Sequence, residues 1–176
     1  MTSIHDQGKS ALDAFEALPW PAGTACRRGP AAGRHARFTP DCVVVYPCGT
    51  EVAVELKKST TSTAQLRPLD YHTTVVWRQG EGWWVLPPQD VMLLALRYVG
   101  QHCTSSFGCF NPGKPNGSWT RWHCLPDEVP QRVLAAHRSG LVSPLRDVAV
   151  RMAAEIRSQW EAHKTMVRAA AGVAHG

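Results

Sequence analysis

Two acidic residues and a lysine, Asp41, Glu55 and Lys57, have a spacing that a short β-hairpin would bring together. Two strand-like runs, 43–46 and 50–56, flank a Pro-Cys-Gly turn signal. If this turn is a three-residue loop, counting outward along the strands places Asp41 directly opposite Glu55. Directly opposed side chains lie about 4.5–5.5 Å apart at Cβ, so two acids there repel each other unless a cation lies between them.

The second strand of this hairpin would separate charged from apolar side chains. Lys57 is two residues beyond Glu55 and therefore shares its face. The other face carries Val52, Val54 and Leu56. Hard divalent cations prefer carboxylate oxygens, and the ammonium remains to orient a water molecule or to offset developing negative charge. These groups could hydrolyse a phosphodiester.

The elements around the hairpin follow from apolar periodicity and from Gly and Pro positions. We expect a helix at 8–18, a connector loop at 23–33, strands at 72–77 and 83–86, a helix at 91–98 capped by Gln89 or Asp90, and helices at 127–137 and 145–168. This order predicts an α/β (α+β) fold with a central mixed sheet flanked by helices. Trp119 and Trp122 are expected in the core.

Length and composition indicate one domain over residues 1–176, with a core at 8–99, a loop at 100–118 and a helical C-terminal part at 119–176. The net charge of +5 suits a polyanionic partner. No apolar run is as long as a membrane span, which needs about 18 residues. The first residues lack the pattern of a signal peptide. We therefore expect a cytoplasmic protein without membrane contact.

The six cysteines are expected to be free thiols in that reducing compartment. Cys103, Cys109, His123 and Cys124 could gather around zinc, but their spacing matches none of the regular zinc patterns. Structural zinc is therefore not expected.

Pro40-Asp41 followed by Glu55-Leu56-Lys57 resembles the motif of the PD-(D/E)xK nuclease superfamily, over residues 8–90. The order of helix, hairpin, further strand and helix also agrees with that family's restriction-endonuclease-like core. The resemblance implies that Asp41, Glu55 and the Leu56 carbonyl hold Mg²⁺, with Mn²⁺ as a substitute. Lys57 would position or activate the attacking water, and the products would carry a 5′-phosphate and a 3′-hydroxyl.

Further residues follow from the same resemblance. Many members add an acid from the first helix, for which Glu16 is the candidate, and an exposed helix acid is the alternative reading. Lys58 points to the other side of the strand, so Lys57 is preferred as the catalytic lysine. Arginine can read guanine, and asparagine or glutamine can read adenine. The candidate DNA contacts are Arg27, Arg28, Lys58, Gln65, Arg67, Gln101, Asn111, Lys114 and Arg121.

The chain most resembles a small type II restriction endonuclease. We expect a sequence-specific enzyme for double-stranded DNA, acting as a homodimer with a tetramer as the alternative, and without a small-molecule substrate. A homing endonuclease and a Holliday-junction resolvase share the same core and are the alternatives. An alternative of another class is a non-catalytic DNA-binding module, stabilised by zinc in one variant.

Overall fold

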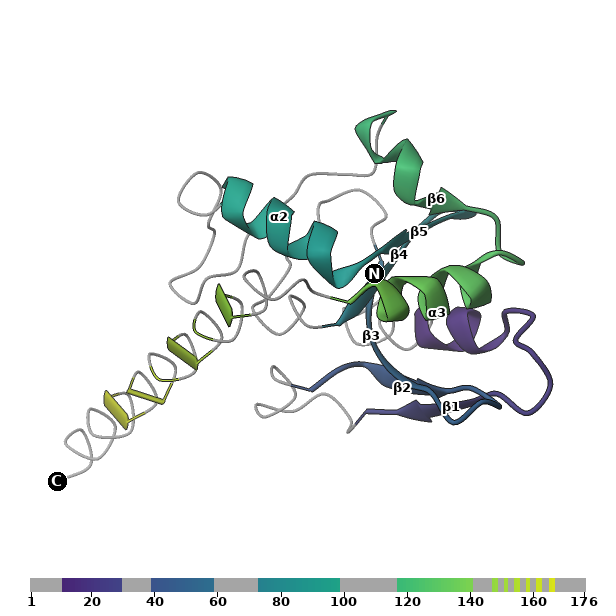
Figure 1. Cartoon of the computed structure of the whole chain (residues 1–176), viewed down its shortest axis with the longest axis horizontal. Coiled ribbons are helices and arrows are strands. Elements are labelled where there is room, and N and C mark those ends of the chain that lie inside the picture. Colours follow the sequence, from purple (N-terminus) through teal and green to yellow (C-terminus); the bar gives the residue numbers. More distant parts are fainter. Residues whose placement is uncertain are drawn as a thin grey trace, which may run out of the picture.

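A central sheet organises the computed structural model (Figure 1). The structure describes residues 11–29, 39–58, 73–98, 117–140 and ten positions of the C-terminal segment between 147 and 166. The strands, in sequence and in sheet order, are β1 (Ala25–Arg28), β2 (Cys42–Val45), β3 (Glu51–Lys58), β4 (Thr74–Gln79), β5 (Gly82–Leu86) and β6 (His123–Cys124). Only β3 and β4 run parallel, so the sheet is mixed, as predicted.

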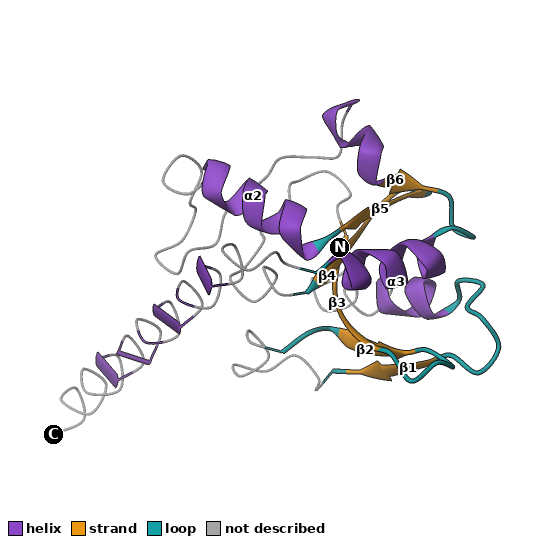
Figure 2. Ribbon diagram, in the orientation of Figure 1, coloured by secondary structure: helices purple, strands orange, loops and turns teal. Residues whose placement is uncertain are grey.

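Helices accompany the sheet, which makes the fold α+β (Figure 2). They are a short helix at residues 11–16, α2 (Pro88–Tyr98), the 3₁₀ helix η3 (Gly117–Trp122) and α3 (Val129–Ser139). The described residues between 147 and 166 are also helical, and those from Arg151 onward are exposed. Within the described ranges, no helix is both long enough and apolar enough to cross a membrane.

Alternation along the strands gives the sheet two apolar faces. One face packs against the 11–16 helix and α3. The buried cluster between them includes Val44 and Val54 from the sheet and Phe15 from the helix. Tyr46 connects the sheet to α3, because its hydroxyl donates a hydrogen bond to the Pro130 carbonyl, 2.7 Å away. We call this face, with its cluster of buried residues, the α3 face.

The opposite face packs against α2 and η3, and we call it the α2 face. Its buried cluster consists of Val75, Trp77, Leu86, Val91, Met92, Trp119 and Trp122. The rings of Trp77 and Trp119 meet edge to face at 5.2 Å, and those of Trp119 and Trp122 do the same. The expectation that Trp119 and Trp122 lie in the core is confirmed.

Three element predictions need correction. The predicted helical part at 119–176 contains β6, which pairs with β5 at the edge of the sheet. The 23–33 connector contains β1, which pairs with β2 through Arg28 and Cys42. The sequence carries no clear strand signal here, because β1 is a short edge strand with mostly exposed residues, two of them arginines. Helix α2 begins at Pro88 rather than after it, because proline is tolerated in the first turn, where its missing N–H has no intrahelical partner.

Candidate functional site

The β2–β3 turn is the predicted three-residue loop. The Tyr46 amide donates to the Thr50 carbonyl at 2.9 Å, and the Gly49 amide donates to the Tyr46 carbonyl at the same distance. Gly49 has a φ of 80°, a left-handed conformation that glycine adopts without steric cost. The loop thus closes with Tyr46 and Thr50 as its first pair and sets the register of the whole hairpin.

That register places Asp41 across from Glu55. Cys42 pairs with Val54 in the antiparallel ladder, so one further step outward opposes Asp41 to Glu55. The Leu56 amide donates to Asp41 Oδ2 at 2.7 Å. A side chain therefore takes the place of the next backbone acceptor, and the Asp41 carboxylate is held beside the Glu55–Leu56 peptide.

Pro40 explains why the ladder stops at this point. By the same register, Pro40 would be the next partner of Leu56. Proline has no amide hydrogen, so it cannot donate to the Leu56 carbonyl as a ladder residue would. The Leu56 carbonyl, which is on the same side of the strand as its amide, therefore points toward Asp41 without a ladder donor from Pro40.

Glu55 and Lys57 form a buried ion pair on the α2 face. Lys57 Nζ lies 2.6 Å from Glu55 Oε1, and the exposed fractions of the two side chains are 9% and 2%. In the parallel ladder Glu55 is paired with Val75 and Lys57 with Trp77, both fully buried. The pair is thus bordered by apolar side chains, where charge interactions are stronger than in water.

These groups fit a divalent cation. Mg²⁺ is commonly bound through one or two carboxylates together with water and substrate phosphate, rather than by a full cage of protein ligands. The carboxylates of Asp41 and Glu55 and the carbonyl of Leu56 supply such a partial set of oxygens around one point of the hairpin. Among the described residues, no group of three or more His, Cys, Asp or Glu side chains gathers as a metal site.

Glu16, the predicted third acid, is occupied elsewhere. Arg28 Nε donates to Glu16 Oε1 at 2.8 Å, and its Nη2 donates to Asp13 at 2.7 Å. Arg28 is paired with Cys42 and so faces the α3 side, opposite to Glu55 and Lys57. A catalytic role for Glu16 stays a prediction, and it requires Glu16 to leave Arg28.

Burial is the main cause that raises the pKa of the Cys42 thiol at the start of β2, and Cys26 and the charges of Asp41, Glu16 and Glu55 raise it further.

The described DNA-contact candidates are each engaged in an ion pair. Arg27 pairs with Glu51, and both side chains are more than half exposed. Arg121 lies over the Trp122 ring at 4.4 Å and 3.3 Å from Asp90 Oδ1, and its side chain is 62% exposed. The others, Gln65, Arg67, Gln101, Asn111 and Lys114, lie outside the described residues, as does the side chain of Lys58.

His123 and Cys124 do not face one another. They are neighbours in β6, and successive strand residues point to opposite faces. Cys124 is buried on the α3 face, whereas the His123 ring lies against Trp84 at 5.1 Å. Their side chains therefore lie on opposite faces of the sheet, and Cys103 and Cys109 lie outside the described residues, so the expectation about zinc stays a prediction.

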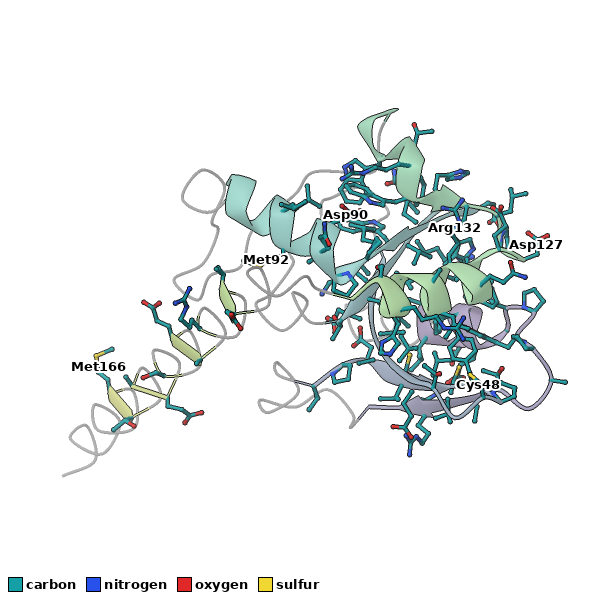
Figure 3. All side chains as sticks on the ribbon, viewed as in Figure 1. Cys48, Asp90, Met92, Asp127, Arg132 and Met166 are labelled. Atoms are coloured by element: carbon teal, nitrogen blue, oxygen red, sulfur yellow. The ribbon has the colours of Figure 1, made fainter. Side chains whose placement is uncertain are left out.

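Two positioning contacts had no readable signal in the sequence. Asp90, labelled with Met92 on α2 in Figure 3, accepts a 2.6 Å hydrogen bond from the Trp122 indole and so fixes η3 to α2. The Gly29 amide donates to the Asp41 carbonyl at 2.8 Å. Both contacts join segments that are separated in the sequence, and the second requires β1, where the sequence predicts a loop.

Comparisons with known proteins add one likeness of fold. No protein-family model matches the chain, and a comparison with curated proteins gives no match. A solved structure of the Holliday junction resolvase Hjc from Archaeoglobus fulgidus is similar, with a TM-score of 0.41 and 18% identity over 69% of this chain and 94% of that chain. A likeness at this level carries no argument about activity, so function has to be argued from the site.

Proposed function

We propose that this protein is a metal-dependent endonuclease that hydrolyses DNA phosphodiester bonds. The observation that carries the proposal is the hairpin register, which opposes Asp41 to Glu55 and places Lys57 beside Glu55. A hydrolytic nuclease needs oxygens that hold a cation near the scissile phosphate and a cationic group near the attacking water. The motif resemblance found in the sequence assigns the same residues to the same roles.

Each residue has a distinct task in this proposal. Asp41 and Glu55, with the Leu56 carbonyl, would hold Mg²⁺ or Mn²⁺, which when bound polarises the phosphate and lowers the pKa of water. The Leu56 amide keeps the Asp41 carboxylate oriented toward β3. Lys57, whose ammonium lies 2.6 Å from Glu55 Oε1, would position or activate the attacking water.

Double-stranded DNA is the proposed substrate class, because the net charge of +5 favours a polyanion. We propose sequence-specific cleavage by a homodimer of the restriction type, leaving a 5′-phosphate and a 3′-hydroxyl. A homing endonuclease and a Holliday-junction resolvase would use the same hairpin. These enzyme types cut different DNA substrates, so a set of different DNA forms distinguishes between them.

The test compares substrates and metals in one series. Purified protein is incubated with supercoiled plasmid, linear phage DNA and a synthetic four-way junction, each with Mg²⁺, with Ca²⁺ or with EDTA. Discrete duplex fragments with Mg²⁺ support the restriction or homing type, and symmetric nicks in the junction alone support a resolvase. Random degradation indicates a non-specific nuclease.

A Lys57→Ala variant completes the series. It should bind DNA as the wild type does and fail to cut it. If the wild type binds all these substrates and cuts none of them with any metal, the protein is a DNA-binding module and the nuclease proposal is wrong.

A further inference from the structure

The end of β1 approaches the start of β2 more closely than a side chain would allow. The Gly29 amide donates to the Asp41 carbonyl at 2.8 Å. A Cβ atom on Gly29 would lie 2.2 Å from the Pro40 carbonyl oxygen and 3.1 Å from that of Asp41. Both obstacles are backbone atoms, which cannot rotate out of the way as a flexible side chain can.

This contact holds Asp41 from one side while β3 holds it from the other. Its backbone carbonyl is bound by Gly29 and its carboxylate by the Leu56 amide. Within the described residues, Arg28 and Cys42 form the last pair between β1 and β2, and the bond from the Gly29 amide to Asp41 lies one step beyond it. The direction in which the chain enters β2, and hence the position of the Asp41 carboxylate, depends on this close approach.

We infer that Gly29 is a positioning residue for the metal ligand Asp41, a role that rests on the proposed function. Gly29 has no side chain that could serve as a ligand. It acts by letting β1 approach the Pro40–Asp41 peptide, so that the carboxylate is aligned with Glu55 before a cation arrives.

The steric overlap at position 29 indicates how far a substitution there would move Pro40 and Asp41. Real Cβ atoms essentially never approach backbone atoms closer than 3.0 Å, so alanine at position 29 must displace Pro40 from the 2.2 Å separation. The displacement needed is about 1 Å, whereas a functional constellation tolerates about 0.5 Å. The metal site should therefore be damaged more than the fold.

The experiment pairs Gly29→Ala with Gly49→Ala as a matched control. Gly49 has a φ of +80° with nothing within 4 Å of its Cβ position, so alanine there strains the far end of the same hairpin without contacting Asp41. Ca²⁺ affinity is measured by isothermal titration calorimetry, and stability by urea unfolding. Gly29→Ala should weaken Ca²⁺ binding by about 10–100-fold, the range found when residues that orient metal ligands are replaced. Gly49→Ala should lose stability and keep its affinity within about twofold.

Wild-type-like Ca²⁺ affinity in Gly29→Ala would overturn the inference, and so would an equal loss of affinity in both variants. Absence of Ca²⁺ binding by the wild type would instead overturn the proposed function, and the inference with it.

Amide hydrogen exchange of the wild type tests the same idea if Gly29→Ala does not fold. Ca²⁺ should slow exchange at the Gly29 and Leu56 amides and leave the Gly49 amide unchanged. An unaffected Gly29 amide would contradict the positioning role.

Discussion

Replacing Lys57 by methionine tests whether its ion pair with Glu55 contributes to stability as a buried pair does. The substitution keeps the length and apolar stem of the side chain and removes the ammonium that lies 2.6 Å from Glu55 Oε1. With exposed fractions of 9% and 2%, the two side chains have little access to screening water. Removing one partner of a buried pair costs about 3–5 kcal/mol, because the remaining charge stays in an apolar environment.

This loss is measurable by urea unfolding in EDTA, followed by tryptophan fluorescence. With a slope of about 2 kcal/mol/M, the transition midpoint should fall by about 1.5–2.5 M. The double variant Glu55→Gln with Lys57→Met removes both charges and should regain most of the loss, because no uncompensated charge is then buried. This variant controls for the lost packing of the lysine stem.

A cation should replace the missing ammonium. Ca²⁺ should therefore bind Lys57→Met more tightly than the wild type and stabilise it more at equal concentration, because stabilisation by a ligand grows with the logarithm of its concentration relative to its Kd. A loss below about 1 kcal/mol, the value for solvent-exposed pairs, would refute the buried-pair reasoning. Weaker Ca²⁺ binding by Lys57→Met would refute the competition between ammonium and metal for Glu55.

Three other outcomes are expected. Asp41→Asn or Glu55→Gln should each abolish Ca²⁺ binding measurable by calorimetry while DNA binding in a gel-shift assay persists; unchanged Ca²⁺ affinity would remove that residue from the metal site. Asp90→Ala leaves a buried indole N–H without its acceptor, and urea unfolding should show a loss of about 1–3 kcal/mol; a loss near zero would mean that η3 does not depend on this bond. Hydrogen bonding with Thr50 lowers the pKa of the exposed Cys48 thiol, so its thiolate persists to lower pH. Iodoacetamide labelling, followed by peptide mass spectrometry, should therefore begin at lower pH than in a Thr50→Val variant; identical profiles would contradict the assignment.

The hairpin was predictable because local chemistry sets its register. Proline and glycine in the turn favour a three-residue loop, and the alternation of valine with charged residues decides which side chains share a face of the strand. From these two facts the opposition of Asp41 to Glu55 follows by counting, and the observed pairing of Cys42 with Val54 agrees with it. The mixed sheet and the order of the elements from β2 to α2 were predictable for similar reasons.

Contacts between distant segments were not predictable. The pairing of Arg28 with Glu16 needs both β1 and the first helix in place, and β1 shows almost no apolar alternation. The bond between Asp90 and Trp122 joins two helices that are separated by the predicted 100–118 loop. Such interactions depend on how the elements pack in three dimensions. The residue types alone indicate only that Asp90 could cap a helix and that Glu16 could be an exposed acid.

The central claim is that the hairpin hydrolyses DNA. The most direct measurement incubates end-labelled duplex and four-way-junction DNA with Mg²⁺ and either the wild type or Lys57→Ala, and analyses the ends of the products. We expect cleavage by the wild type alone, with 5′-phosphate and 3′-hydroxyl ends and with equal DNA binding by both proteins. Binding without cleavage by the wild type, or normal cleavage by Lys57→Ala, would contradict it.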